Sequence, residues 1–169
     1  MEVLYKNQAK TEPLRVYFDN SGGGADIELK RGTAVSFDYA WAGTLIDGTQ
    51  ITAASKFPGR CQVVKLPANG DKSFAGVARS DCKIPAGKGV WILIDGPGSV
   101  VLVRTLVSCT AGVTGLACSY DAAVPGTFKA IGAAKGKGTA IAMQTLNPGG
   151  TETLVQVYLE EGQTASPVA

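Results

Sequence analysis

The sequence predicts an all-β protein, a compact β-barrel or β-sandwich with short turns and at most one or two short helical turns. Apolar runs rich in β-branched residues recur along the chain, and strands favour such residues. Pro-Gly pairs, which favour turns, recur at 58–59, 97–98, 125–126 and 148–149. No window of helical length keeps an apolar period of about 3.6 residues with capping residues at its ends.

The strongest expected strands lie in the middle of the chain, at residues 89–95 and 99–107. They flank the turn sequence Gly96-Pro97-Gly98, so we expect them to form a β-hairpin. Both runs are apolar at nearly every position, which is typical of central strands covered on both faces.

Residues 153–159 form a further expected strand, in which Val155, Val157 and Leu159 alternate with wetter positions such as Gln156. One helical turn is expected over 49–56, with Thr49 as its N-cap. Gly-Lys-Gly occurs at 87–89 and at 136–138, but irregular spacing elsewhere gives no ground for inferring a repeat. Weaker strands are expected at 15–18, 27–29, 34–39, 62–66, 74–79, 128–131 and 139–146.

The chain is expected to form one domain with two distinct ends. We assign residues 1–20 to an extended N-terminal arm, 21–161 to a single β domain, and 162–169 to a flexible C-terminal tail. The ends can be interpreted in two ways. The first is that both are frayed termini, which most domains have. Alternatively, Val3, Leu4 and Tyr5 add a strand to a neighbouring subunit.

Composition excludes several functional classes. The 169 residues contain no histidine, which removes the commonest general base and transition-metal ligand. Sixteen basic and fourteen acidic residues are interspersed, so no basic patch for nucleic acid or an anionic membrane stands out. We also find no secretory signal and no apolar run of about 18 residues that would span a membrane.

Apolar residues are abundant and cysteines are scattered. The mean hydropathy is +0.12, which indicates a large core or apolar surface covered by another subunit. The four cysteines are Cys61, Cys82, Cys109 and Cys118, and no two of them form a Cys-x-x-Cys pair. Three disulfide pairings are formally possible, but in a chain made in the cytosol we expect four buried thiols.

No segment carries a catalytic, cofactor or metal motif that we retain. The stretch from Gly132 to Thr139 departs from a phosphate-binding loop in spacing and precedes an expected strand rather than a helix. The aspartates lie mostly in turns, and no calcium-loop spacing is present. Trp91 lies in an apolar strand and is expected in the core, whereas Trp41 is the aromatic residue expected at a surface or interface.

The order of these segments resembles the capsid decoration (cement) proteins of tailed bacteriophages over about residues 30–160. The resemblance rests on turns and strands and includes no site motif; the four cysteines have no counterpart in it. The matching segments are residues 63–67, 73–78, 89–94, 97–103, 126–128 and 154–158.

The resemblance implies a non-enzymatic virion protein without cofactors. Such proteins are made in the host cytoplasm, usually trimerise, and bind the outer surface of the expanded shell, where they bridge subunits of the major capsid protein. Because many copies attach to one shell, their weak individual contacts add up to strong overall binding. Val3, Leu4, Tyr5 and Trp41 are the expected subunit or capsid contacts. The alternatives are a tail or fibre-base component, a β-sandwich that binds a glycan or small ligand, and an enzyme using Asp and Glu alone.

Overall fold

The computed structural model describes residues 12–45, 48, 50–52, 63–67, 73–118, 126–130 and 140–160. These residues form strands and turns and contain no helix, which confirms the all-β prediction. Among them, accordingly, there is no helix with the length and apolar character needed to cross a membrane.

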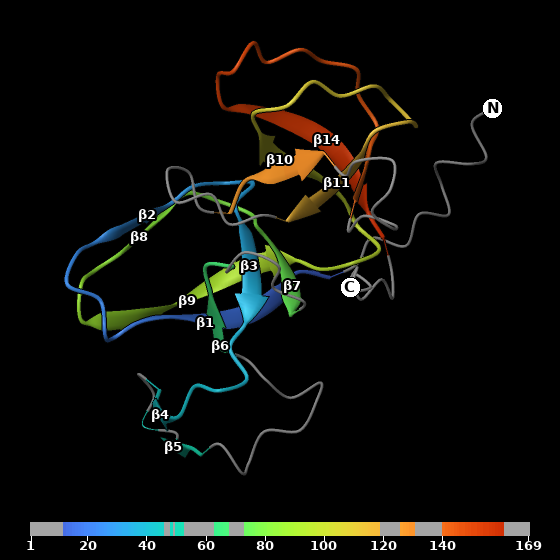
Figure 1. Ribbon diagram of the computed structural model, residues 1–169. Coiled ribbons are helices and arrows are strands. Elements are labelled where there is room, and N and C mark those ends of the chain that lie inside the picture. Colours follow the sequence, from blue (N-terminus) through green and yellow to red (C-terminus); the bar gives the residue numbers. More distant parts are fainter. Residues whose placement is uncertain are drawn as a thin grey trace, which may run out of the picture.

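The first half of the chain forms a closed five-stranded barrel (Figure 1). β1 and β9 make its longest ladder, with Tyr17 opposite Trp91 in an antiparallel register. Its side chains alternate, so that Val16, Phe18 and Ile92 point into the barrel and are buried. The strands are β1 (Leu14–Asn20), β3 (Ala34–Phe37), β6 (Val63–Lys65), β7 (Phe74–Ala78) and β9 (Lys88–Asp95).

The second half forms another closed five-stranded barrel, which lies above the first in Figure 1. β10 and β14 make its longest ladder, with Val103 opposite Val155. The strands are β10 (Val100–Thr105), β11 (Gly115–Cys118), β12 (Phe128–Ala130), β13 (Ala140–Ala142) and β14 (Thr153–Leu159).

The two barrels have the same topology. In each, the first strand runs parallel to the third and antiparallel to the fifth. The second strand pairs antiparallel with the third and the fourth, and the fourth pairs antiparallel with the fifth. The chain therefore contains a tandem structural repeat, with the second copy beginning at β10.

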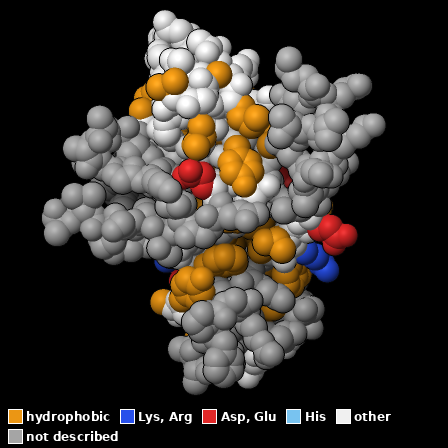
Figure 2. Space-filling view, turned by 90° about the vertical axis from the view of Figure 1, so that its right-hand side faces the viewer, with side chains coloured by type: hydrophobic (Ala, Val, Ile, Leu, Met, Phe, Trp, Pro, Cys, Tyr) orange, Lys and Arg blue, Asp and Glu red, His pale blue; other side chains and the backbone are white. Residues whose placement is uncertain are grey.

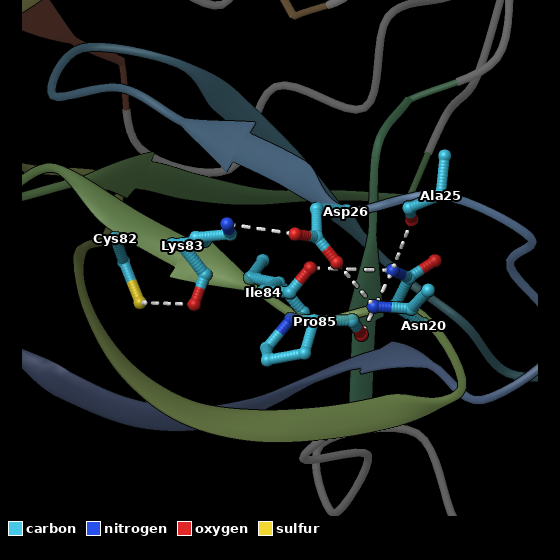
Figure 3. Close-up of polar contacts among 8 residues, drawn as sticks. Asn20, Ala25, Asp26, Cys82, Lys83, Ile84 and Pro85 are labelled. Carbon is cyan, nitrogen blue, oxygen red and sulfur yellow. Dashed lines mark hydrogen bonds and ion pairs between the residues drawn. The ribbon is translucent and has the colours of Figure 1, made fainter.

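Two short two-stranded sheets extend the first barrel (Figure 1). β2 (Ile27–Leu29) pairs with β8 (Cys82–Ile84), and β4 (Gly43–Thr44) pairs with β5 (Gln50–Ile51). The side-chain amide of Asn20, at the end of β1, holds the base of the β2–β8 sheet. It donates to the backbone oxygens of Ala25 at 3.0 Å, Ile84 at 3.3 Å and Pro85 at 3.1 Å (Figure 3).

The barrels share a packed junction built on β3 and β7. Val35 points into the first barrel, whereas its neighbour Ala34 belongs to the core of the second. Phe74 of β7 packs edge-on against Phe128 of β12, with ring centroids 6.1 Å apart. Backbone hydrogen bonds join the same region: Ala34 N donates to Gly126 O at 2.9 Å. The second barrel thus covers the outer surface of these two strands, which makes the whole a single packed unit.

The expected hairpin is wrong, although both of its strands exist. β9 pairs with β1 and β7, whereas β10 pairs with β12 and β14. Each strand therefore has both edges occupied inside its own barrel. The turn at residues 96–98 instead connects one barrel to the other. Within this turn, Gly98 N donates to Leu159 O at 2.8 Å.

The domain boundary after residue 20 also needs correction. Residues 14–20 of the expected arm form β1, because their apolar side chains alternate into the first barrel. In the expected helical turn at 49–56, Gln50–Ile51 pair as a strand with Gly43–Thr44. The remaining arm residues 1–11, the rest of that turn and the tail 162–169 lie outside the described residues.

Candidate interaction surface

The outer surface of the β1–β9 ladder carries a cluster of aromatic side chains. Tyr17 and Trp91 lie opposite each other in register, with ring centroids 5.4 Å apart and an interplanar angle of 70°. Edge-on packing of this kind is favourable for aromatic rings. Tyr17 is itself buried, because Leu45 and Trp41 pack over it from the adjoining loop.

Trp41 reaches this cluster from the connection between β3 and β4. A turn at Asp38 sets its position: Trp41 N donates to Asp38 O at 3.3 Å, and Ala40 N donates to the Asp38 carboxylate at 3.2 Å. The ring centroid of Trp41 then lies 6.2 Å from that of Tyr17. Gly43 leaves room for the indole, since a Cβ at position 43 would lie 2.8 Å from it.

Arginine and leucine side chains border the aromatic cluster. The guanidinium of Arg15 lies over the ring of Trp91, 4.6 Å from its centroid, in a cation–π contact. Leu93 is 46% exposed and lies opposite Arg15 in the ladder. We call the surface formed by Arg15, Tyr17, Trp41, Trp91 and Leu93 the aromatic face.

The two tryptophans do not both lie where the sequence predicts. Trp41 is half-buried and packs against Tyr17, so it keeps part of its surface accessible. The core assignment of Trp91 is wrong, because Trp91 is out of phase with the inward-pointing Ile92 and lies half-buried on the outer surface. Val3, Leu4 and Tyr5 lie outside the described residues.

Sequence reasoning missed four residues of this face, which are Arg15, Tyr17, Trp91 and Leu93. For the two on β1 a signal was present, because Arg15 and Tyr17 alternate with the apolar residues Val16 and Phe18. In a strand that pattern places Arg15 and Tyr17 on the same surface, away from the core.

Groups of three or more His, Cys, Asp or Glu side chains able to hold a metal ion do not occur among the residues that the structure places. Burial raises the pKa of the Cys109 thiol, which lies in the core of the second barrel. What the face offers is aromatic and guanidinium surface on a rigid barrel, which suits the binding of another macromolecule.

Comparison with known proteins identifies no family for this chain. No protein-family model matches the chain, and no curated protein shows significant sequence similarity to it.

Proposed function

We propose that this protein is a non-enzymatic structural protein of a phage virion, which decorates and stabilises the capsid as a homotrimer. The partner is the major capsid protein, and the place of action is the outer surface of the shell. The proposal starts from the resemblance of residues 30–160 to capsid decoration proteins. The observation that supports it best is the aromatic face.

The composition of this face fits a protein partner. Trp, Tyr and Arg are the residue types that most often dominate binding energy at protein interfaces. Arg15 and Trp91 already contact each other, so little side-chain freedom is lost when a partner covers them. Except for Trp41, the residues of the face lie on strands whose backbone is fixed by the closed barrel, which favours repeated docking in one geometry.

A glycan-binding module is the second candidate, because half-buried tryptophans also stack on sugar rings. The contact between Arg15 and Trp91 counts against it, since the guanidinium occupies a ring face that a sugar would use. A glycan array separates the two: binding to glycans that is lost in Trp41→Ala would favour the module over decoration.

The decisive experiment is co-sedimentation with expanded capsids and with procapsids. We expect the wild-type protein to bind expanded capsids and not procapsids. Trp91→Ala should weaken that binding by about 2 kcal/mol or more, roughly 30-fold, as for a central contact of an interface. Glu28→Ala, which removes an exposed side chain of β2, is the control and should bind normally. Failure of the wild-type protein to bind either particle would refute the proposal.

A further inference from the structure

Arg15 places an exposed positive charge at the border of the aromatic face. It lies opposite Leu93 in the β1–β9 ladder, so Trp91 is its diagonal neighbour on the same surface, within reach of a long side chain. The guanidinium carbon lies 4.6 Å from the centroid of the Trp91 ring. This cation–π contact holds the guanidinium against the barrel, although Arg15 remains exposed to solvent.

Two carboxylates that border the aromatic face already have cationic partners. Asp95, two positions beyond Leu93 on β9, forms an ion pair with Arg79, with the Nε atom 3.4 Å from the carboxylate oxygen. Asp38, in the turn after β3, forms an ion pair with Lys65, with the Nζ atom also 3.4 Å from the oxygen. Both carboxylates are therefore neutralised by cations that do not belong to the aromatic face.

The charge of Arg15 is not compensated in this way. Among the residues that the structure describes, no carboxylate forms an ion pair with its guanidinium. Asp19, the next carboxylate along β1, lies four residues away and accepts hydrogen bonds from Ser21 N at 3.3 Å and from Ser21 Oγ at 3.0 Å. Charged residues make up only 18% of the chain, and Figure 2 shows hydrophobic side chains with few charged ones among them on one side of the molecule. An exposed guanidinium without a carboxylate partner is therefore an unusual feature of this surface.

We propose that the aromatic face binds an acidic segment of another protein, in which an Asp or Glu carboxylate pairs with Arg15. A guanidinium carries five N–H donors in a planar fork that matches a carboxylate, and the contact with Trp91 supplies no oxygen acceptor for them. Leu93, which is 46% exposed, and the half-buried Trp41 and Trp91 provide apolar surface for the residues that flank the carboxylate.

A carboxylate fits this site better than the phosphate backbone of a nucleic acid. A nucleic acid carries a charge on every nucleotide, and proteins that bind it present several cations together. Arg15 is the one charged residue among the five that form the aromatic face, and Arg79 beside it is paired with Asp95. This inference deepens the proposed function and rests on it for the site, because it names the chemistry that the capsid partner brings to the aromatic face.

The first test uses the full-length protein to select peptides from a library of random short sequences displayed on beads. We expect the selected peptides to share an Asp or Glu that is flanked by apolar residues. Arg15→Gln removes the charge and should weaken binding of a selected peptide, measured by fluorescence anisotropy, by about tenfold or more, as for the loss of a charge-assisted hydrogen bond. Arg31→Gln is the matched control, because it removes an exposed arginine in the turn between β2 and β3, and it should leave the affinity unchanged.

A double-mutant cycle then assigns the contact to one pair of groups. Replacing the Asp or Glu of the peptide by Asn or Gln should weaken binding to the wild-type protein by the same factor, and should cause no further loss with Arg15→Gln. Arg15→Lys keeps the charge and should retain part of the affinity, and thermal unfolding shows whether each variant folds. Selected peptides without acidic residues, the absence of any selected peptide, or an equal loss in Arg31→Gln would overturn the inference. Arg15-dependent binding of a single-stranded DNA oligonucleotide as tight as that of the peptide would also overturn it.

Co-sedimentation with expanded capsids separates this inference from the proposed function. Capsid binding that is weakened in Arg15→Gln and normal in Arg31→Gln supports both. Capsid binding that does not depend on Arg15 overturns the present inference and leaves the proposed function intact. Arg15-dependent binding of acidic peptides without any capsid binding supports the present inference and refutes the proposed function.

Discussion

The ring of Tyr17 lies directly over Gly89 on the neighbouring strand, where a Cβ atom at position 89 would overlap the phenol ring. We therefore expect Gly89→Ala to displace Tyr17 and to lower the free energy of unfolding by about 1–3 kcal/mol. Urea denaturation followed by tryptophan fluorescence measures this, because Trp41 and Trp91 both contact Tyr17. Gly24→Ala is the control: nothing lies within 4 Å of a Cβ there, and its effect should stay within about 0.5 kcal/mol. Equal effects of the two variants would contradict the proposed packing.

The junction between the barrels depends on Gly126. Its φ of +81° disfavours other residues, and a Cβ there would overlap Thr33 and lie 2.9 Å from Ala34 O. We expect Gly126→Ala to destabilise the protein by about 2–4 kcal/mol, combining backbone strain with loss of junction packing. Calorimetry measures this as a lower midpoint of unfolding. Gly150→Ala is the matched control, because Gly150 has a φ of +83° and open space around it. If both variants lost the same stability, strain alone would account for the effect and the junction would not be involved.

The ion pair on the β2–β8 sheet predicts a pH response. Lys83 Nζ lies 2.7 Å from the Asp26 carboxylate (Figure 3), and this hydrogen bond lowers the pKa of Asp26, with a further contribution from Ala86 N–H. The same contact raises the pKa of Lys83 above 10.5. The pair therefore stabilises the sheet at intermediate pH. Its contribution is lost as pH falls through the lowered pKa of Asp26, and again as pH rises through the raised pKa of Lys83.

We expect Lys83→Met to raise the pKa of Asp26 towards its usual value of 3.8. Carboxyl carbon chemical shifts recorded over pH 2–6 measure the pKa of Asp26 directly. Lys30→Met removes a different exposed lysine and should leave the Asp26 titration unchanged. A wild-type Asp26 midpoint at or above 3.8 would contradict the contact.

Cys82 and Cys109 should differ in reactivity. Cys109 is 3% exposed and its burial raises the pKa of the thiol, whereas Cys82 is half-buried at the start of β8. In a Cys61→Ser, Cys118→Ser background, we expect Cys109 to react with a disulfide reagent at least about tenfold more slowly than Cys82. The difference should disappear in denaturant. Equal rates in the folded protein would show that Cys109 is accessible.

Local patterns in the sequence predicted where the strands lie better than which strands pair with each other. The alternation of Val155, Val157 and Leu159 with Gln156 placed β14 at the bounds that the structure gives. The same kind of reasoning joined β9 to β10, because a Pro-Gly turn separates two apolar runs. It failed because the edges of both strands are taken by partners far away in the sequence, and short-range composition carries no information about those.

The aromatic face was only partly predictable for a related reason. Residues 90–94 are all apolar, so periodicity did not reveal that Trp91 and Leu93 point outward while Ile92 points inward. The structural repeat was also invisible, because the shared property is strand order rather than residue identity.

Closure of the first barrel has a consequence for synthesis in the cell. Its longest ladder joins β1 to β9, so every hydrogen-bonded strand of that barrel is available once residue 95 has left the ribosome. We expect this half to fold while the remainder is still being translated. The nascent β3 and β7 would then offer Ala34, Phe74 and Val77 as a preformed template on which the later strands assemble.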